Sequence, residues 1–273
     1  MPAAVEAFDA AADRFDDRFA EWRSVAAQRA AVRSRLLSTF PAGSHLLELA
    51  GGTADDALYM AAHGRSVLLT DGSPSMVSRA RDKVRAAGLT HRVQARAILL
   101  EELDTFARTA AGPPFDGAWS NFAGLNCVAD LRPVARGLAR LLRPASCALL
   151  VVFGPHPPGE VIVQMLRGDV RAAFRRFRPG PVPARLGGRM FHVHYHTPRA
   201  IARAFAPWFR LERMDGVGVF VPPSAAEPFV SRLPRLLGAL QAVDRLVARP
   251  LAQLGDHVLL HFVRTATSPE DRS

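Results

Sequence analysis

The feature that most constrains this fold is a strand, turn, helix and strand pattern over residues 45–71. Three leucines precede a run of small residues, Ala50 to Ala54, and apolar residues at helical spacing then continue until Gly64. The stretch from Ser66 to Asp71 predicts a second strand. A unit of this kind pairs its two strands in parallel and places the turn at the carboxyl edge of the sheet.

The turn and the end of the second strand have the chemistry of a nucleoside-binding site. Small residues let a ligand approach the backbone, and the following helix directs its free N–H groups into the same space. Asp71 can accept two hydrogen bonds from a ribose diol. The turn lacks the three glycines typical of a pyrophosphate site, and Asp55 and Asp56 would repel a pyrophosphate. We therefore expect a cationic or zwitterionic nucleoside ligand.

These residues resemble the first motif of the class I S-adenosylmethionine-dependent methyltransferases, an acidic residue followed by three alternating small residues. Glu48, Ala50, Gly52 and Ala54 match the motif, with Ala at its first and third glycine positions, and Asp71 matches the acidic residue after the second strand. The resemblance implies an α/β fold, a Rossmann-like doubly wound sheet of seven strands with the last strand antiparallel. It also implies S-adenosylmethionine as the cofactor.

The order of predicted elements agrees with such a layered sheet. Ser73 and Pro74 predict the start of a helix, by capping it and by occupying its first position. We expect further strands at residues 93–100, from 115, at 146–153, at 209–221 and at 256–264, and helices at 131–142 and 199–206. The resemblance rests on motifs over residues 45–153 and on element order alone beyond them.

The resemblance also implies which residues contact the cofactor. In the family, the segment after the third strand contacts the adenine, and the loop after the fourth lies beside the transferable methyl group. The expected cofactor residues are Phe15, Glu48, Ala50, Gly51, Gly52, Thr53, Asp71, Gly72, Met76, Leu99, Leu100 and Asn121. A purely local role for Asn121, bonding within its own turn, is the alternative. The expected acceptor residues are Phe122, Asn126 and Cys127.

The N-terminal 40 residues place Phe15, Phe19, Trp22 and Val25 at helical intervals, which predicts amphipathic helices. Such helices can pack on the sheet, or, as the resemblance implies, form a lid over the cofactor. We therefore divide the chain into a helical lid at 1–40 and a methyltransferase domain at 41–273. That domain contains helical cover insertions at about 155–190 and 222–255.

The first insertion combines an apolar stripe with many arginines. A helix is expected over residues 161–177, between two Pro-rich hinges. The stripe consists of Ile162, Met165, Leu166, Val170, Phe174 and Phe177. A basic amphipathic helix can lie on an anionic membrane, but such a stripe more often packs on its own domain, and we expect packing here.

The segment from Phe191 to His196 alternates like a strand and sends its histidines to one face. His192, His194, His196 and Tyr195 are therefore candidate general bases, because imidazole titrates near neutral pH. Three histidines on one face are also metal-ligand types, but no carboxylate cluster accompanies them, and we expect no metal.

Composition limits the partners and the compartment. The net charge is +10, but Lys83 is the only lysine, and an arginine bias often reflects genome base composition rather than a ligand. We therefore expect no nucleic-acid partner. The two cysteines have no metal or redox spacing, and no signal peptide or membrane span is evident, which favours the cytoplasm.

The sequence thus predicts an S-adenosylmethionine-dependent methyltransferase acting on oxygen, nitrogen or carbon of a small, apolar metabolite, such as a biosynthetic intermediate. One alternative is a lipid methyltransferase that rests on a membrane surface through the Arg-rich helix. Another is a cofactor-binding protein of this fold that transfers no methyl group. The identity of the acceptor and the oligomeric state stay open.

Overall fold

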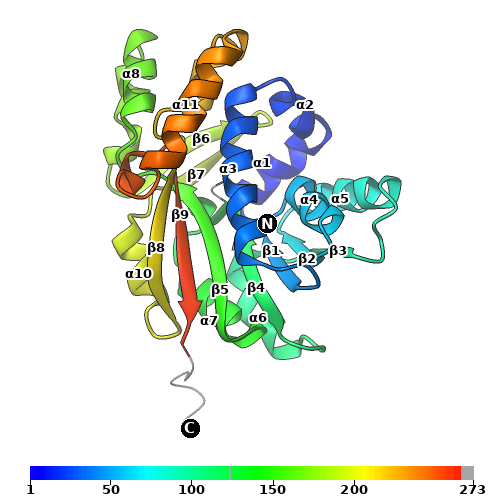
Figure 1. The fold of residues 1–273 in the computed structure, drawn as a ribbon. Helices are drawn as coiled ribbons and strands as arrows, with labels where there is room; N and C mark the ends of the chain where they lie inside the picture. The colour runs from blue at the N-terminus through cyan, green and yellow to red at the C-terminus, as the bar shows by residue number, and fades with distance from the viewer. Residues whose placement is uncertain (123, 266–273) are drawn as a thin grey trace.

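The computed structural model describes residues 1–122 and 124–265, and its main feature is a seven-stranded sheet with helices on both faces (Figure 1). The strand order is β3-β2-β1-β4-β5-β9-β8. Only β9 runs antiparallel to its neighbours, so the expected fold is confirmed. The strands are β1 His45–Leu49, β2 Ser66–Asp71, β3 Val93–Ala97, β4 Phe115–Ser120, β5 Leu142–Phe153, β8 Phe209–Val217 and β9 His257–Arg264.

Both faces of the sheet are buried, as a mostly parallel sheet requires. Leu46 of β1 packs among residues of α3, α4 and α5, whereas Leu47 points to the other face, among residues of α6, α7 and α10. This alternation explains why β1 carries apolar residues on both faces, at Leu46 and Leu47. The helices are α3 Arg23–Thr39, α4 Asp55–Ala62, α5 Pro74–Ala86, α6 Leu103–Thr109, α7 Arg132–Leu141 and α10 Pro198–Phe205. Ser73 caps α5 by accepting a hydrogen bond from the Met76 N–H, as predicted.

The first insertion differs from the single helix that the sequence predicts over residues 161–177. It forms α8 Pro158–Leu166, α9 Val170–Ala173 and the 3₁₀-helix η4 Arg175–Phe177. The break falls at Gly168, whose φ is +76°, and at Asp169, whose side chain caps α9 by accepting from the Ala172 N–H. A left-handed glycine followed by a new cap ends one helix and starts another.

The second predicted hinge, residues 179–183, is also wrong, because it lies largely within a strand. β6 Pro181–Leu186 pairs with β7 Arg189–His194 in an antiparallel hairpin. Pro181 and Pro183 lack N–H donors, and a strand with one free edge tolerates that loss. The first insertion is therefore mixed α and β rather than helical.

The second insertion is mainly helical, as expected. It contains three 3₁₀-helices and one long helix: η5 Ser224–Ala226, η6 Val230–Arg232, α11 Pro234–Val247 and η7 Ala252–Leu254. Figure 1 shows α8 and α11 rising together beyond the carboxyl ends of the parallel strands. None of the helices in the described part of the chain combines the length and hydrophobicity that crossing a membrane requires.

The apolar stripe of the first insertion faces solvent, so the expectation that it packs on the domain is wrong. Leu166 is 84% exposed and Ile162 is 58% exposed. The cause is geometric: α8 is anchored near its base, where Glu160 is buried, and its outer turns extend away from the sheet. The exposed stripe residues are Ile162, Met165, Leu166, Val170, Phe174 and Phe177.

Candidate functional site

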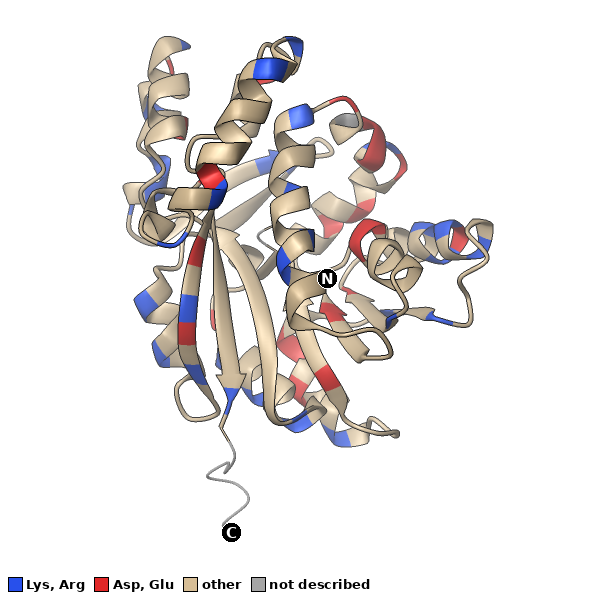
Figure 2. Cartoon of the chain, in the orientation of Figure 1, with Lys and Arg blue, Asp and Glu red and all other residues tan. Residues whose placement is uncertain are grey.

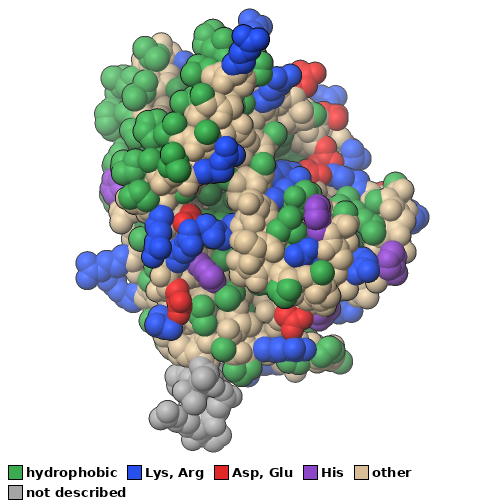
Figure 3. Space-filling view, in the orientation of Figure 1, with side chains coloured by type: hydrophobic (Ala, Val, Ile, Leu, Met, Phe, Trp, Pro, Cys, Tyr) green, Lys and Arg blue, Asp and Glu red, His purple; other side chains and the backbone are tan. Residues whose placement is uncertain are grey.

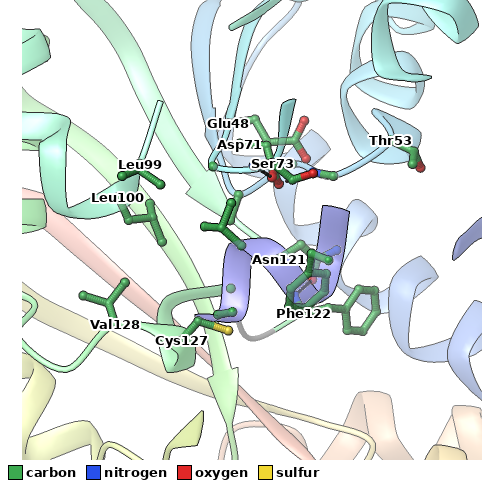
Figure 4. A pocket seen from close by; sticks show the side chains of 18 of the residues that line it. Glu48, Thr53, Asp71, Ser73, Leu99, Leu100, Asn121, Phe122, Cys127 and Val128 are labelled. Atoms are coloured by element: carbon green, nitrogen blue, oxygen red, sulfur yellow. Dashed lines mark hydrogen bonds between the residues drawn. The ribbon is translucent and has the colours of Figure 1, made fainter. Parts of the chain in front are cut away.

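A pocket lies at the carboxyl ends of β1, β2 and β4, beneath the N-terminal helices α1 Ala3–Ala11 and α2 Phe15–Phe19 (Figures 1 and 4). This is the edge where parallel sheets bind ligands. Most of the residues expected at the cofactor and acceptor sites line it: Phe15, Glu48, Ala50, Gly51, Gly52, Thr53, Asp71, Gly72, Leu99, Leu100, Asn121, Phe122 and Cys127.

The turn between β1 and α4 brings its backbone to the pocket. Ala50 and Ala54 adopt left-handed conformations, with φ of 51° and 73°, although both carry a Cβ. Gly52 has φ of +56° with open space where a side chain would begin, whereas a Cβ at Gly51 would lie 2.6 Å from the Leu69 side chain. Gly51 is therefore fixed by packing and Gly52 by backbone conformation.

Asp71 ends β2 and points into the pocket, beside Glu48 and Ser73 (Figure 4). Its Oδ2 accepts from the Gly52 N–H at 2.9 Å and its Oδ1 accepts from the Ser73 N–H at 2.8 Å. Burial raises the pKa of this carboxyl, while the two N–H groups act in the opposite direction. Each oxygen keeps acceptor capacity, so a diol could bind the same carboxylate.

Glu48 offers a second carboxylate to the pocket. Its Oε1 accepts from the Trp119 indole N–H at 3.1 Å, and its buried Oε2 has no hydrogen-bond partner within the described chain. Burial, reinforced by Asp56, raises the pKa of Glu48 well above its usual value. An unpartnered buried carboxylate oxygen in a pocket suits a cationic ligand group such as an ammonium.

Arginines of α3 neutralise the acidic start of α4. Arg29 lines the pocket, pairs with Asp55 and lies 5.3 Å from the centroid of the Phe122 ring. Arg33 binds Asp56 at 2.6 Å. The sequence offered one signal for these partners, two arginines spaced by one helical turn opposite two adjacent aspartates.

Asn121 makes the local hydrogen bond that the sequence left open and also lines the pocket. Its Nδ2 donates to Asp56 Oδ2 at 2.7 Å, and its Oδ1 accepts from the Phe122 N–H at 2.9 Å. The side chain thus holds its own turn and also forms part of the pocket wall.

The N-terminal helices are attached to the pocket rim by hydrogen bonds. Asp9 accepts from the Ser73 hydroxyl at 2.7 Å and from the Ser75 N–H at 2.8 Å, and these bonds, the Ser75 N–H first, lower its pKa. Lys83 binds Asp16 of α2 at 2.9 Å and also pairs with Asp55. Val5 and Phe8, which the expected set lacks, line the pocket from α1.

The candidate bases on the histidine face do not line the pocket, so the structure does not bring them together with the other expected site residues. Phe191 and Val193 of β7 pack against α1, with Phe8 and Phe191 ring centroids 5.9 Å apart. Strand alternation therefore turns His192 and His194 to the opposite face, away from α1. The strand ends at His194. Beyond it, the His196 Nε2 is hydrogen-bonded to the Val128 carbonyl oxygen at 2.8 Å.

Met76 and Asn126 also lie outside the pocket lining. Met76 belongs to the buried face of α5. Asn126 is fully buried and joins two segments, since its Oδ1 accepts from the Phe153 N–H at 3.1 Å and its Nδ2 donates to the His194 carbonyl at 2.6 Å. Both residues follow pocket-lining segments in the sequence, but their side chains turn toward the protein interior.

A buried ionic cluster lies behind the acceptor side of the pocket, and sequence reasoning did not find it. We define it as Glu160, Arg176, Tyr195, Asp256 and His257. Arg176 pairs with Glu160, donates to Asp256 Oδ1 at 2.6 Å and lies 5.9 Å from the Tyr195 ring centroid. Tyr195 therefore belongs to this cluster rather than to the pocket lining. The one sequence signal for this cluster is that Asp256 and His257 stand at the start of the last predicted strand, 256–264.

His257 connects this cluster to the pocket wall. Its ring stacks on Phe153 at 5.1 Å between centroids and meets the pocket-lining Phe122 edge-on at 5.5 Å. Burial lowers its pKa to about 4, so the ring is neutral at neutral pH.

Two further groups limit the chemistry that the site can perform. Burial, followed by the nearby Asp71 and Glu101, raises the pKa of the Cys127 thiol to about 12, so this side chain stays protonated. Over residues 1–122 and 124–265, no group of three or more His, Cys, Asp or Glu side chains is arranged to hold a metal ion.

Comparison with known proteins identifies the family. Residues 46–145 match the family described as a methyltransferase domain. The tRNA 5-carboxymethoxyuridine methyltransferase of Escherichia coli strain K12 is 29% identical over 129 residues, which are 47% of each chain. The chain thus spans about half the length of the curated relatives it matches.

Solved structures extend the likeness over most of the chain. A DhpI–SAH complex superposes with a TM-score of 0.57 at 18% identity, over 98% of this chain and 96% of that one. A geranyl diphosphate C-methyltransferase from Streptomyces coelicolor A3(2), in complex with Mg²⁺, geranyl diphosphate and S-adenosyl-L-homocysteine, gives 0.51 at 12% identity, over 88% and 79%. These likenesses concern the fold. Residues 46–145 are therefore a methyltransferase domain, the fold around it is that of the class I S-adenosylmethionine-dependent methyltransferases, and the matched domain indicates S-adenosylmethionine as the cofactor.

Proposed function

We propose that this chain transfers a methyl group from S-adenosylmethionine to a small, apolar acceptor. The supporting observation is the division of the pocket lining. Glu48, Asp71 and Ser73 lie together on one side, whereas Leu100, Phe122, Cys127 and Val128 face them across the pocket (Figure 4). A mostly apolar wall with a few polar groups at one end favours an apolar ligand in a fixed orientation.

The cofactor fits the polar side of this division. Asp71 would accept hydrogen bonds from the ribose hydroxyls, and Glu48 Oε2 would receive the ammonium of the methionine part. The glycine turn would let the cofactor approach the backbone, and Leu99 would contact the adenine ring. The cofactor-binding set that we propose is Phe15, Glu48, Ala50, Gly51, Gly52, Thr53, Asp71, Gly72, Leu99, Leu100 and Asn121. We propose Phe122 and Cys127 for the acceptor side.

The protein's task in such a reaction is alignment and the exclusion of water. The cofactor supplies a methyl group that its sulfonium already activates for in-line displacement. The helices α1 and α2 act as the lid, because their Val5, Phe8 and Phe15 line the pocket, whereas α3 packs on the sheet. No imidazole occurs among the described pocket-lining residues. A hydroxyl acceptor would therefore lose its proton to water or to the exposed carboxylate Glu101, which lines the pocket.

The charge around the pocket favours a small molecule over a nucleic acid. Acidic side chains gather on α1, α2 and the start of α4 (Figure 2). Five carboxylates line the pocket, Glu48, Asp55, Asp56, Asp71 and Glu101, against the single cation Arg29 in the described lining. This balance repels a phosphate backbone. The curated relative named as a tRNA methyltransferase makes tRNA the second candidate acceptor, and the test includes it.

The test measures transfer of labelled methyl from S-adenosylmethionine to two acceptor pools. One pool is an organic-solvent extract of metabolites, and the other is total tRNA. We expect label in the extract, formation of S-adenosylhomocysteine, and no label in tRNA. Label in tRNA alone would overturn the proposal, and cofactor binding without transfer to either pool would favour a non-methylating role.

A matched pair of variants links that activity to the pocket. Phe122→Ala removes an apolar wall at the acceptor side, whereas Phe220→Ala removes a phenylalanine that is 46% exposed just before the second insertion. We expect Phe122→Ala to raise KM for the acceptor about tenfold, and Phe220→Ala to leave it unchanged. Equal behaviour of the two variants would place the acceptor elsewhere.

A further inference from the structure

The two insertions together expose many apolar side chains along α8, α9, η4, η6 and α11. We define the apolar crest as ten exposed side chains: Ile162, Met165, Leu166, Val170, Phe174, Phe177, Phe229, Leu233, Leu236 and Leu246. Leu166 is 84% exposed and Phe229 is 68% exposed. Figure 3 shows apolar side chains gathered over this end of the molecule. Single exposed apolar residues need no explanation, but a contiguous group marks an interaction surface.

Contacts between the insertions make the crest one surface. The Arg167 guanidinium at the end of α8 donates to the Ala225 carbonyl of η5 at 2.7 Å. At the base, Gly159 of α8 lies against Pro223. The tip of α8 is therefore tied to the segment that leads into α11, and the apolar groups of both insertions project in a shared direction.

Exposed arginines occur on the same segments as the crest, while most acidic side chains of these segments are already engaged, and Glu21 beside η6 is exposed. Arg167, Arg171, Arg178, Arg232 and Arg235 are exposed. Among the acids of the insertions, Glu160 is buried against Arg175 and Arg176, and Glu227 accepts hydrogen bonds from Ser24 and Ser231. Asp169 caps α9. The surface therefore presents apolar groups and positive charge together.

We propose that the apolar crest docks on an anionic lipid bilayer. Leucine, isoleucine, methionine and phenylalanine side chains on convex helix ends can enter the interface, while the arginines contact anionic headgroups. The mainly aliphatic composition disfavours nucleic acid, which binds through aromatic stacking beside basic groups. The crest stands at the same edge of the sheet as the pocket, so docking would bring the pocket near the phase where apolar molecules collect. Docking of the crest on lipid does not depend on which acceptor the enzyme methylates.

Vesicle co-sedimentation of the full chain tests the proposal. The probes are vesicles of phosphatidylcholine alone and of phosphatidylcholine with phosphatidylglycerol. We expect binding only to the anionic vesicles, falling about tenfold between low and high salt because screening weakens the arginine contacts. Equal binding to neutral vesicles, or no binding to either, would overturn it.

Matched variants assign the binding to the crest. Leu166→Ser with Phe229→Ser should weaken vesicle binding about tenfold or more. Met190→Ser, at a methionine that is 58% exposed on the β-hairpin, should leave it unchanged. Cofactor affinity, measured by calorimetry, should stay the same in all three proteins and reports that they fold. Vesicle binding that the double variant retains would contradict the assignment.

The oligomeric state separates lipid from a protein occupant. If the crest instead covers a second copy of this chain, light scattering without vesicles will show a dimer that Leu166→Ser with Phe229→Ser dissociates, and this result would overturn the lipid proposal. A monomer that binds anionic vesicles through the crest supports it.

Discussion

The two sides of the pocket are built in different ways. Most of the proposed cofactor side comes from one continuous stretch, residues 45–73, in which Asp71 accepts from the N–H groups of Gly52 and Ser73, and Phe15, Leu99, Leu100 and Asn121 complete it. The structure behind the proposed acceptor side is assembled from distant segments: Asn126 bonds to residue 194, Arg176 to residue 256, and Gln28 to residue 256. A site made by one turn can be inferred from local spacing, but a site made by long-range packing cannot.

The comparison predicts that the region behind the proposed acceptor side depends on buried ion pairs, whereas ion pairs beside the cofactor side, such as Lys83–Asp16, are partly exposed. Arg176→Met should lower the free energy of unfolding by about 3–5 kcal/mol, because it leaves Asp256 buried without its arginine and Glu160 with Arg175 as its remaining cation. Urea denaturation followed by circular dichroism measures this. Adding Glu160→Gln and Asp256→Asn to Arg176→Met should recover part of the loss. A loss below about 1 kcal/mol would mean that the cluster does not hold the first insertion.

The same region should carry a pH dependence of stability. Burial lowers the pKa of His257 from 6.5 to about 4, so between these values the unfolded chain binds a proton that the folded chain does not. Stability from this group is complete above about pH 6.5 and is lost as pH falls toward 4, by up to about 3 kcal/mol. His257→Gln should reduce the change of melting temperature with pH over this range. The control is His192→Gln, which changes an exposed histidine. Identical slopes would contradict the assignment.

The cofactor side should show a smaller and more specific effect. Asp71→Ala removes a buried charged acceptor, which is worth about 1.5–3 kcal/mol, so calorimetry should show S-adenosylmethionine binding weakened tenfold or more. Asp82→Ala, at an exposed aspartate of α5, is the control. Unchanged affinity with native circular dichroism would remove Asp71 from the cofactor site.

The histidine face should show the smallest effect. His192→Gln and His194→Gln change side chains that lie outside the described pocket lining, so turnover and cofactor affinity should stay within about twofold of the original values. A large loss of turnover in either variant would show that this face reaches the acceptor during the reaction and would remove the contrast between the two faces of β7.

Some features of this structure follow from local sequence patterns, and others depend on contacts between distant segments. Local patterns predict the turn after β1 and the Ser73 cap, and the family resemblance predicts the seven-stranded sheet with its antiparallel last strand. The structure confirms all three. Strand alternation at residues 191–194 was correctly expected, but its direction was not, because the choice of buried face depends on α1, more than 180 residues earlier. Likewise, the stripe on α8 has a helical period, yet no local pattern tells whether another surface covers it.

Lys83 offers a single lysine side chain for chemical labelling of this protein. It is the only lysine in the chain, and its amine joins Asp16 of the lid to Asp55 beside the pocket. Acylation at this side chain would cap the amine and remove both ion pairs. An amine-reactive reagent therefore samples these two ion pairs at a single lysine side chain, which is 30% exposed. Mass spectrometry of the labelled peptide would measure the rate of acylation at the Lys83 amine, with and without S-adenosylmethionine.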